Sequence, residues 1–472
     1  MVFSSNIFLF AFLPTFLAVY YLLPFRVKSA WILFGSYALY SWWRLDFLWL
    51  LIAVTATAYL FALAIARAEG RRRFLLLTVA VLFNLCALGY FKYTNFGIES
   101  FNTAITAVGF QPFSWSPILL PIGLSFFVFH AISYLVDVYR EEEPPTHNLL
   151  DFAAFIALFP HLIAGPVLKY NLLAGQFRAR THTLEKFSYG ATRFMTGFAK
   201  KVLIADSIAP LVKAAFETPN PTFADSWLGA LAYTLQLYFD FSGYSDMAIG
   251  LAAMMGFKFP ENFNHPYISR SITEFWRRWH MSLSSWLREY LYIGLGGNRG
   301  GRGRTYVNLF LTMLLGGLWH GANWTFVLWG AWHGGILALE RRMKEAQLWK
   351  PSPAWLTIPG TLLLVMLGWV MFRADNVSDA LRMYRGMFGL NGLGLSDTLA
   401  WQVRGSELVT MVLAVMLVYV APWWGSRVGD VGGQLLRPRA AMAATLALMP
   451  LFVLAILKLS AQSYTPFLYF QF

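Results

Sequence analysis

Long runs of apolar residues, separated by short polar loops, organise most of this sequence. An α-helix needs about 20 apolar residues to cross a bilayer core of about 30 Å. Eight runs approach that length and predict membrane-spanning helices: Ile7–Leu23, Phe47–Ala66, Phe74–Phe91, Pro117–Val136, Trp227–Met255, Ala354–Phe372, Leu408–Trp423 and Ala440–Leu459.

Four further apolar runs are too short to span a bilayer alone, namely Ala30–Trp43, Phe152–Val167, Tyr306–His320 and Trp324–Leu339. Interrupted segments persist at membrane depth only where protein or a water-filled cavity surrounds them, so these runs are where we expect function. Together the runs predict an all-α, polytopic integral membrane protein with about 11–13 membrane segments, some of them short or re-entrant.

Composition supports a membrane protein. Charged residues make up 13% of the 472 residues and apolar residues 57%, and the mean hydropathy is +0.52. Soluble domains carry about 25% charged residues. These values exclude an ordinary soluble enzyme, a disordered protein and a disulfide scaffold.

The net charge of +13 indicates orientation, because the basic residues cluster in short loops. Cytoplasmic loops of membrane proteins are rich in Lys and Arg and contact anionic lipid, so we expect lipid and not nucleic acid as a partner. The rule places Arg26 and Lys28, the Arg67–Arg73 cluster and the Arg427–Arg439 loop in the cytoplasm. Both termini then lie on the opposite, periplasmic side. The topology of 149–226 stays open.

Histidines within apolar runs are the first candidates for chemistry, because an ionisable residue in the membrane is expensive. His320 stands in GGLWHGANW (316–324), where a short run ends and Gly321 and Asn323 can end the helix. A histidine at such a break can line a cavity, with Trp319 and Asn323 beside it on the substrate path. The alternative is a structural histidine that caps the broken helix.

His333 follows His320 by thirteen residues. An unbroken helix would place the two imidazoles about 140° apart, but the break could turn the second helix back and aim His333 at the same cavity. A hydrogen-bonded packing histidine is the alternative.

Two acidic residues lie inside the Trp227–Met255 run. Asp240 and Asp246 flank Ser242 and Tyr244 in the sequence DFSGYSD. Buried carboxylates need partners. The group is therefore either the polar wall of a tunnel or a structural ion pair.

Aromatic residues and arginines alternate between residues 257 and 305, as is typical of the bilayer interface. We expect in-plane amphipathic helices here, closed by the flexible Gly294–Arg304 loop. If FWRRWHMSLS (275–284) is helical, the side chains of Trp276, Arg277 and His280 share one face of that helix. The basic and aromatic residues that could hold a phosphorylated nucleotide donor are Trp276, Arg277, Arg278, His280, Arg299 and Arg302. An interfacial anchor is the alternative. No grouping of Cys and His fits a metal site.

Several motifs resemble those of the membrane-bound O-acyltransferase family, most closely its alginate-acetylating branch. They are MVFSSNIFLFAFLP at the start, LPIGLSFFVFHAISYLVDVYR, FPHLIAGPV, DFSGYSDMAIG, ENFNHPY, TEFWRRWHMSLSSWLREYLYIGLGG, WHGANW, GAWHGG and the end PFLYFQF. Their number and order make the resemblance specific.

The resemblance implies one membrane domain over 1–472, with helices ringed around a central tunnel. Its N-terminal spans would cover 1–140, a catalytic core 150–340 with interfacial helices at 257–305, and C-terminal spans 354–472. The family's hallmark histidine maps onto His320, and a second histidine onto His333. In such a protein a cytoplasmic donor, acetyl-CoA, and a hydroxyl acceptor reach the tunnel from opposite sides, without a metal.

For function, the resemblance implies O-acetylation of an exopolysaccharide, with alginate as the first expectation. A soluble periplasmic acetyltransferase subunit of the SGNH type would act as partner, at the bacterial inner membrane. Acetylation of peptidoglycan or cellulose, D-alanyl transfer to a cell-wall polymer, a transporter or channel, and a non-catalytic scaffold are the alternatives.

Overall fold

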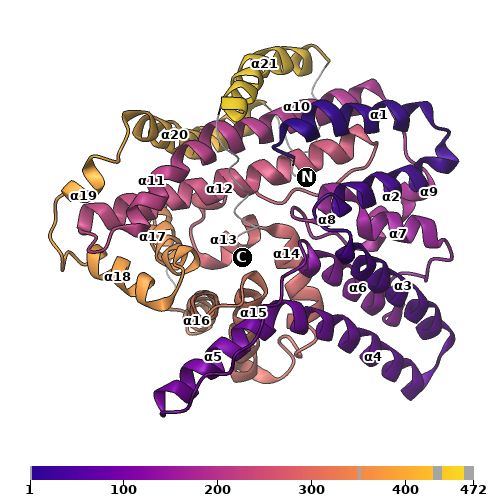
Figure 1. The fold of residues 1–472 in the computed structure, drawn as a ribbon, viewed down its shortest axis with the longest axis horizontal. Coiled ribbons are helices and arrows are strands. Elements are labelled where there is room, and N and C mark those ends of the chain that lie inside the picture. Colours follow the sequence, from indigo (N-terminus) through magenta and orange to yellow (C-terminus); the bar gives the residue numbers. More distant parts are fainter. Residues whose placement is uncertain (1–2, 349–351, 429–437, 462–472) are drawn as a thin grey trace. The chain divides into compact units, whose positions relative to one another are not determined.

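The computed structural model describes residues 3–348, 352–428 and 438–461 of the chain. Every regular element within these ranges is a helix, which confirms the predicted all-α class (Figure 1). Two compact units make up the chain: unit 1 comprises Met1–Thr183 and Leu251–Phe259, and unit 2 comprises Leu184–Gly250 and Pro260–Phe472. Most of the predicted 427–439 loop and of the C-terminal tail from 460 lie outside the described residues.

The helices of unit 1 include two π-helical turns, η1 and η2. They are η1 (Phe8–Phe12), α1 (Leu13–Leu22), α2 (Phe25–Ser41), α3 (Asp46–Arg67), α4 (Gly70–Leu88), η2 (Gly89–Tyr93), α5 (Thr94–Ala107), α6 (Leu124–Tyr139), α7 (Leu149–Ala157), α8 (Phe159–Leu162) and α9 (Tyr170–Arg178).

Three stretches are long and apolar enough to cross a membrane: α3, the continuous helix Gly70–Ala107, and α17 (Ala354–Arg373). Shorter apolar helices are Phe8–Leu22, Leu124–Tyr139, Gly405–Val420 and Thr445–Ala461. These helices agree with a multi-pass membrane protein, and α3 and α17 coincide with predicted runs. The arrangement around a central tunnel stays a prediction.

Two predicted runs of unit 1 have different boundaries in the structure. The helix predicted at Phe74–Phe91 continues to Ala107 through η2. The run predicted at Pro117–Val136 becomes helical only at Leu124. The cause is Gly123, which has a left-handed φ of 76° and packs so closely on α8 that a Cβ there would lie 2.6 Å from the carbonyl oxygen of Leu162.

The predicted short run Phe152–Val167 is broken into α7 and α8 and then continues without helix. Pro160 starts α8, and Gly165 has a φ of 111°, a conformation that glycine adopts readily. This confirms the expectation that the run does not span a bilayer as one helix.

Unit 2 begins with helices in the second half of 149–226, the stretch whose topology the sequence left open. Its helices are α10 (Leu184–Ala199), η3 (Lys200–Ala205), α11 (Asp206–Glu217), α12 (Phe223–Met254, to Gly250), η4 (Pro266–Ile268), α13 (Ile272–Arg278), α14 (Met281–Trp286), η5 (Leu287–Tyr292), α15 (Gly301–His320), α16 (Trp324–Glu345), α17, α18 (Val377–Met387), α19 (Asp397–Ala400), α20 (Gly405–Val428) and α21 (Pro438–Ala461).

Helices α10 and α12 run side by side in close contact (Figure 1). A Cβ at Gly197 would lie 2.7 Å from the backbone nitrogen of Met247, and a Cβ at Gly250 would lie 2.5 Å from the carbonyl oxygen of Gly190. Small residues allow helix backbones to approach closely where lipid provides no hydrophobic drive for association. The α10–α12 seam, from Leu184 through η3 against α12, is therefore a tight contact.

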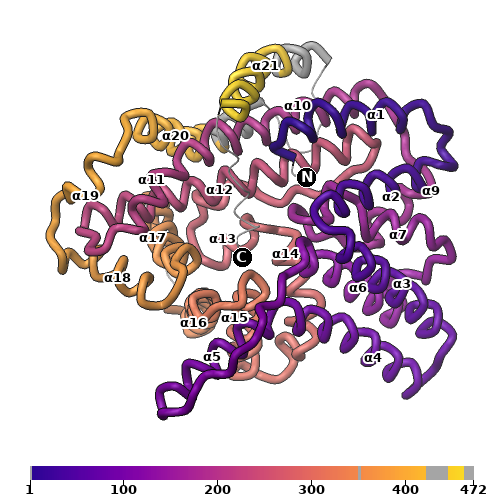
Figure 2. Tube along the Cα trace, in the orientation of Figure 1, coloured from indigo at the N-terminus to yellow at the C-terminus, as the bar shows by residue number. Residues whose placement is uncertain are grey.

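Helices α15 and α16 form a hairpin with a short connection (Figure 2). They contain 20 and 22 residues, so both are longer than the predicted apolar runs. Neither is among the described stretches that are long and apolar enough to cross a membrane, which agrees with the expectation that these runs do not span alone. The polar turns Gly301–Arg304 and Glu340–Glu345 lengthen the helices beyond their apolar runs. A Cβ at Gly330 would lie 2.5 Å from the carbonyl oxygen of Met313.

Candidate active site

The break between α15 and α16 places His320 at the end of a helix, as the sequence predicted. Both Gly321 and Asn323 are extended, with ψ values of 147° and 151°. A Cβ at Gly321 would collide with the ring of Phe326. Asn323 caps α16, because its Oδ1 accepts from the Thr325 N–H at 3.0 Å, and its Nδ2 donates to the Asp375 carbonyl at 2.8 Å. The Asn323 amide therefore holds the break together.

The two candidate histidines flank one tryptophan, Trp329. The Trp329 ring centroid lies 5.2 Å from that of His320 and 5.0 Å from that of His333. His320 keeps 7% of its surface exposed, whereas His333 is completely buried. The hairpin thus brings both histidines to one aromatic core, and His320 is the less completely buried of the two. A cavity shared by both imidazoles stays a prediction.

His333 is held by Trp276 of α13. The Trp276 Nε1–H donates to His333 Nδ1 at 3.4 Å, which places the proton of a neutral His333 on Nε2. Within the described residues, His333 Nε2 has no hydrogen-bond partner. A Cβ at Gly368 would lie 2.8 Å from this nitrogen, so glycine leaves room for the imidazole. Trp276, expected at a donor site, instead contacts a candidate catalytic residue.

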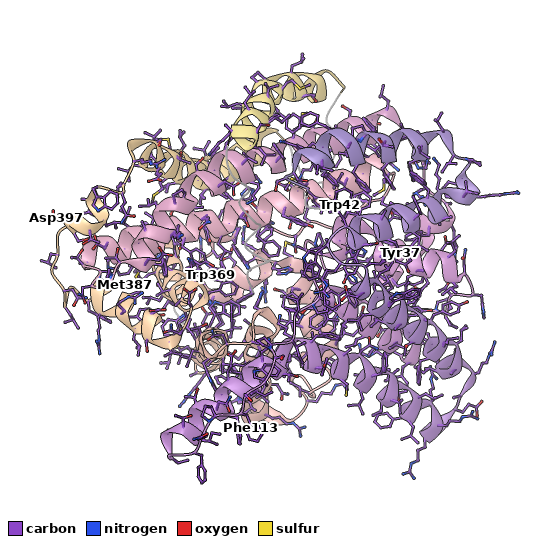
Figure 3. All side chains as sticks on the ribbon, viewed as in Figure 1. Tyr37, Trp42, Phe113, Trp369, Met387 and Asp397 are labelled. Carbon is purple, nitrogen blue, oxygen red and sulfur yellow. The ribbon has the colours of Figure 1, made fainter. Side chains whose placement is uncertain are left out.

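Aromatic rings enclose the rest of this core. Trp369 of α17 stacks on Trp329 with 5.8 Å between centroids, and Figure 3 shows Trp369 among densely packed side chains. The rings of Phe372 and Trp319 lie 5.3 Å and 4.9 Å from the His320 ring. Trp319 is 4% exposed. A neutral imidazole in such a core can accept a proton from a hydroxyl that reaches it.

Asp246 lies in a network of charges at the α10–α12 seam. It is 2.7 Å from Arg193 and 2.7 Å from Lys200, and Arg193 also lies 2.6 Å from Glu261. Burial raises the pKa of Glu261, and the charge of Arg193 opposes that shift. The structure therefore provides the cations that a buried Asp246 needs, in agreement with a structural ion pair.

Asp240 has a partner of its own at the same seam. Lys201 of η3 is 2.9 Å from Asp240 and 2.5 Å from Asp206, and all three side chains are buried. Ser242 and Tyr244 are buried between the two acidic residues, and Ser242 Oγ has no hydrogen-bond partner among the described residues. A role of these residues in a tunnel wall stays a prediction.

His280 differs from the prediction. The helix α13 ends at Arg278, and His280 adopts a left-handed φ of 42° before α14, so His280 does not share a helix face with Trp276 and Arg277. It is fully buried, and its ring lies 4.7 Å from that of Phe241. Burial lowers the pKa of His280 to about 3. A buried, neutral imidazole is not part of a basic surface.

Sequence reasoning missed Asn262, which joins α12 to the link between α13 and α14. Its Nδ2 donates to Ser245 Oγ at 3.0 Å, and its Oδ1 accepts from Ser282 Oγ at 2.8 Å and from His280 Nδ1 at 3.2 Å. It also missed Glu340 of α16, whose carboxylate accepts from the Ile272 N–H at the start of α13 at 2.7 Å. For Asn262, the available signal was its place in the ENFNHPY motif, next to Glu261.

The arginines expected to bind a donor lie on or near the surface of unit 2. Arg278 is paired with Glu274 at 2.9 Å, and Arg302 lies 4.0 Å from Glu345. Arg277 and Arg299 are exposed. Donor binding by this group stays a prediction. Among the described residues, there is no cluster of three or more His, Cys, Asp or Glu side chains that could hold a metal ion.

A family model and several relatives match this chain over most of its length. The model of the membrane-bound O-acyltransferase family matches residues 7–347. The chain is 53% identical to the probable alginate O-acetylase AlgI of Azotobacter vinelandii over the full length of both. It is 36% identical to the peptidoglycan O-acetyltransferase of Helicobacter pylori, over 84% of this chain and 81% of that one.

A more distant relative covers less of the molecule. The teichoic acid D-alanyltransferase of Bacillus subtilis is 30% identical over 50% of this chain and 64% of its own. The family model covers both α10–α12 and the α15–α16 hairpin. From these matches, the chain belongs to the membrane-bound O-acyltransferase family and is an O-acetyltransferase.

Proposed function

We propose that this protein transfers acetyl groups from cytoplasmic acetyl-CoA towards alginate, at the bacterial inner membrane and with both termini in the periplasm. A soluble SGNH-type acetyltransferase in the periplasm completes the transfer to the polymer. The chain is similar to a probable alginate O-acetylase over its full length, which supports alginate as the polymer that receives the acetyl groups. The positive-inside distribution of loop charge supports the orientation.

The observation that carries the chemistry is the position of His320. It ends α15 at a helix break and is the partly exposed member of a pair whose other member, His333, is sealed. His320 takes the proton of the acceptor hydroxyl while the hydroxyl oxygen forms an ester bond with the acetyl carbonyl carbon. The thioester C–S bond breaks, and coenzyme A leaves as the thiolate, which is then protonated.

His333 acts in this proposal as a positioning residue. It is anchored by Trp276 and contacts Trp329, whose other edge lies against His320. Its role is to hold the aromatic core that orients His320. The transient transfer of the acetyl group to His320 itself is a variant of the same mechanism.

The test compares two histidine-to-alanine variants of the purified protein. General-base catalysis contributes about 10²–10⁴-fold, so His320→Ala should lower transfer from labelled acetyl-CoA to mannuronate oligomers by at least about 100-fold. The matched control is His147→Ala, because His147 is exposed in a loop. The assay includes the periplasmic subunit and records coenzyme A release and labelled oligomer.

Folding is checked by size-exclusion chromatography and thermal unfolding in detergent. A folded His320→Ala protein that transfers acetyl at a rate near the wild type would refute the assignment. Label that reaches peptidoglycan fragments but not mannuronate oligomers would move the proposal to the other polymer. Movement of intact acetyl-CoA without thioester cleavage would indicate a transporter.

A further inference from the structure

Two cationic side chains and a histidine in unit 1 lie around Tyr20. Lys28 lies in the first turns of α2, and its ammonium group is 4.1 Å from the Tyr20 ring centroid. Arg180 follows α9, and its guanidinium carbon is 5.9 Å from the same centroid. His182 Nε2 lies 2.9 Å from Tyr20 Oη. We call Lys28, Arg180 and His182 the Tyr20 cluster.

The cluster is built from several segments. Arg180 donates to Tyr20 Oη at 2.9 Å through Nη2 and to the Met255 carbonyl at 3.2 Å through Nε. Tyr20 Oη in turn donates to the Met255 carbonyl at 2.7 Å. Gly256 has a φ of 84°, and a Cβ there would lie 2.9 Å from the Thr181 carbonyl oxygen. The backbone is thus shaped so that residues 180–182 can lie against 255–256.

Aromatic rings hold the guanidinium of Arg180 in place. Its Cζ lies 4.3 Å from the ring centroid of Phe257, 5.0 Å from Phe25 and 5.9 Å from Phe177. Aromatic faces attract cations, and desolvation strengthens that attraction. The side chain is thus oriented without any carboxylate.

The two cationic side chains of the cluster, Lys28 and Arg180, have no acidic partner among the described residues. Lys28 is 6% exposed and donates to the Tyr20 carbonyl, which uses one of its three N–H donors. Burying an unpaired ammonium group is costly, and an anion removes that cost.

The side chains around Lys28 are partly exposed to solvent. Arg180 and His182 are half-buried, and Tyr21 and Phe25 beside them are 41% and 37% exposed. Arg180 also donates through Nη1 to the Gln176 carbonyl at 3.1 Å, so protein acceptors use one N–H of each of its three nitrogens. The second N–H of Nη1 and of Nη2, together with the ammonium group of Lys28, suits the oxygens of a phosphate group. We propose that the Tyr20 cluster binds a phosphate group, supplied either by a soluble phosphorylated ligand or by a phospholipid headgroup.

The experiment measures binding to the purified full-length protein in dodecyl maltoside. The probes are coenzyme A, inorganic phosphate, and mixed micelles that contain phosphatidylglycerol or, as the neutral-headgroup control, phosphatidylcholine. Arg180→Gln and Lys28→Met should each weaken binding at least about 10-fold, because each removes a charge-assisted contact. Arg26→Gln is the matched control, because Arg26 is exposed next to Phe25, and its binding should stay within about twofold of wild type.

The source of the phosphate follows from which probe binds. Binding of coenzyme A or inorganic phosphate that depends on Lys28 and Arg180 indicates a soluble ligand. The same dependence for phosphatidylglycerol, without a response to phosphatidylcholine, indicates a lipid. Wild-type protein that binds none of the probes, or Lys28→Met and Arg180→Gln proteins that bind as tightly as wild type, would overturn the proposal.

Lys28→Met also gives an independent readout, because it replaces a buried unpaired charge with an apolar side chain of similar length. Its thermal midpoint without ligand should rise above that of wild type and should no longer respond to the probe. Arg180 is half-buried, so Arg180→Gln carries the binding test if Lys28→Met does not fold. All of these experiments measure binding or thermal stability and none measures acetyl transfer, so their outcome is separate from the role of His320.

Discussion

The α10–α12 seam and the α15–α16 hairpin both place ionisable residues inside apolar stretches, but they treat them differently. At the seam, Asp246 lies between Arg193 and Lys200, so each charge is compensated. At the hairpin, His320 and His333 lie among aromatic rings, and His320 stays partly exposed. An ionisable residue within a membrane segment is therefore not by itself a site. Its partners and its access decide what it does.

The largest stability effect is expected at the seam, with Asp246→Ala. Removing one partner of a buried ion pair leaves uncompensated charge, here on Lys200, because Arg193 keeps its pair with Glu261, and costs about 3–5 kcal/mol. We expect the free energy of unfolding to fall by that amount in detergent, while transfer per folded molecule changes little. Chemical unfolding and the acetyl-transfer assay measure the two quantities.

The matched control is Asp46→Ala, which breaks the exposed Arg44–Asp46 pair. Exposed pairs contribute about 0–1 kcal/mol, so this variant should unfold almost as the wild type does. An Asp246→Ala protein of unchanged stability whose transfer drops 100-fold would make the seam a substrate path and remove the contrast with the hairpin.

A smaller effect is expected at the hairpin, with His333→Phe. The new ring fills similar volume but leaves the buried Trp276 N–H without an acceptor, which costs about 1–3 kcal/mol of stability. The double variant His333→Phe/Trp276→Phe should lose less stability than the sum of the two single losses, because neither hydrogen-bonding partner then remains unsatisfied, although the smaller ring at 276 leaves a cavity. The four proteins form a double-mutant cycle measured by unfolding.

Transfer by the same four proteins tests whether His333 positions or reacts. A positioning role predicts that His333→Phe lowers transfer less than His320→Ala does. A loss equal to that of His320→Ala in well-folded protein would instead make His333 a direct participant.

The smallest effect is expected for Ser242→Ala. The Ser242 hydroxyl is buried and has no hydrogen-bond partner among the described residues, so its removal should leave stability within about 1 kcal/mol of wild type or raise it. Transfer should also stay the same. A loss of transfer of more than about tenfold would show that this hydroxyl meets the substrate, and would bring the seam into the active site.

The sequence allowed accurate prediction of some elements from apolar length and from glycine and asparagine at a helix end. The helices at α3 and α17 and the break after His320 follow from such patterns. The left-handed backbone at His280 could not be predicted, because only a few per cent of non-glycine residues adopt it and nothing in the local sequence demands it. That residue removes the shared helix face on which the predicted donor surface depended.

Partners that are distant in the sequence were equally inaccessible to prediction. The acidic pair at Asp240 and Asp246 predicted that cations must exist, but not that Lys201 and Arg193 would supply them. Likewise, the contact of Trp276 with His333 joins residues 57 positions apart, and only the packing of α13 on α16 brings them together. Local periodicity carries no information about such pairs.

The glycine contact inside the α15–α16 hairpin has a mechanical consequence. At Gly317 and Gly330 the backbones of α15 and α16 are in contact, with no side chain between them. The two helices therefore have no layer of side chains that would let one shift along the other. A bilayer that thins or thickens can tilt α15 and α16 as one body, but the separation of the imidazoles stays constant. We therefore expect the geometry of the two histidines to be insensitive to membrane tension and lipid length.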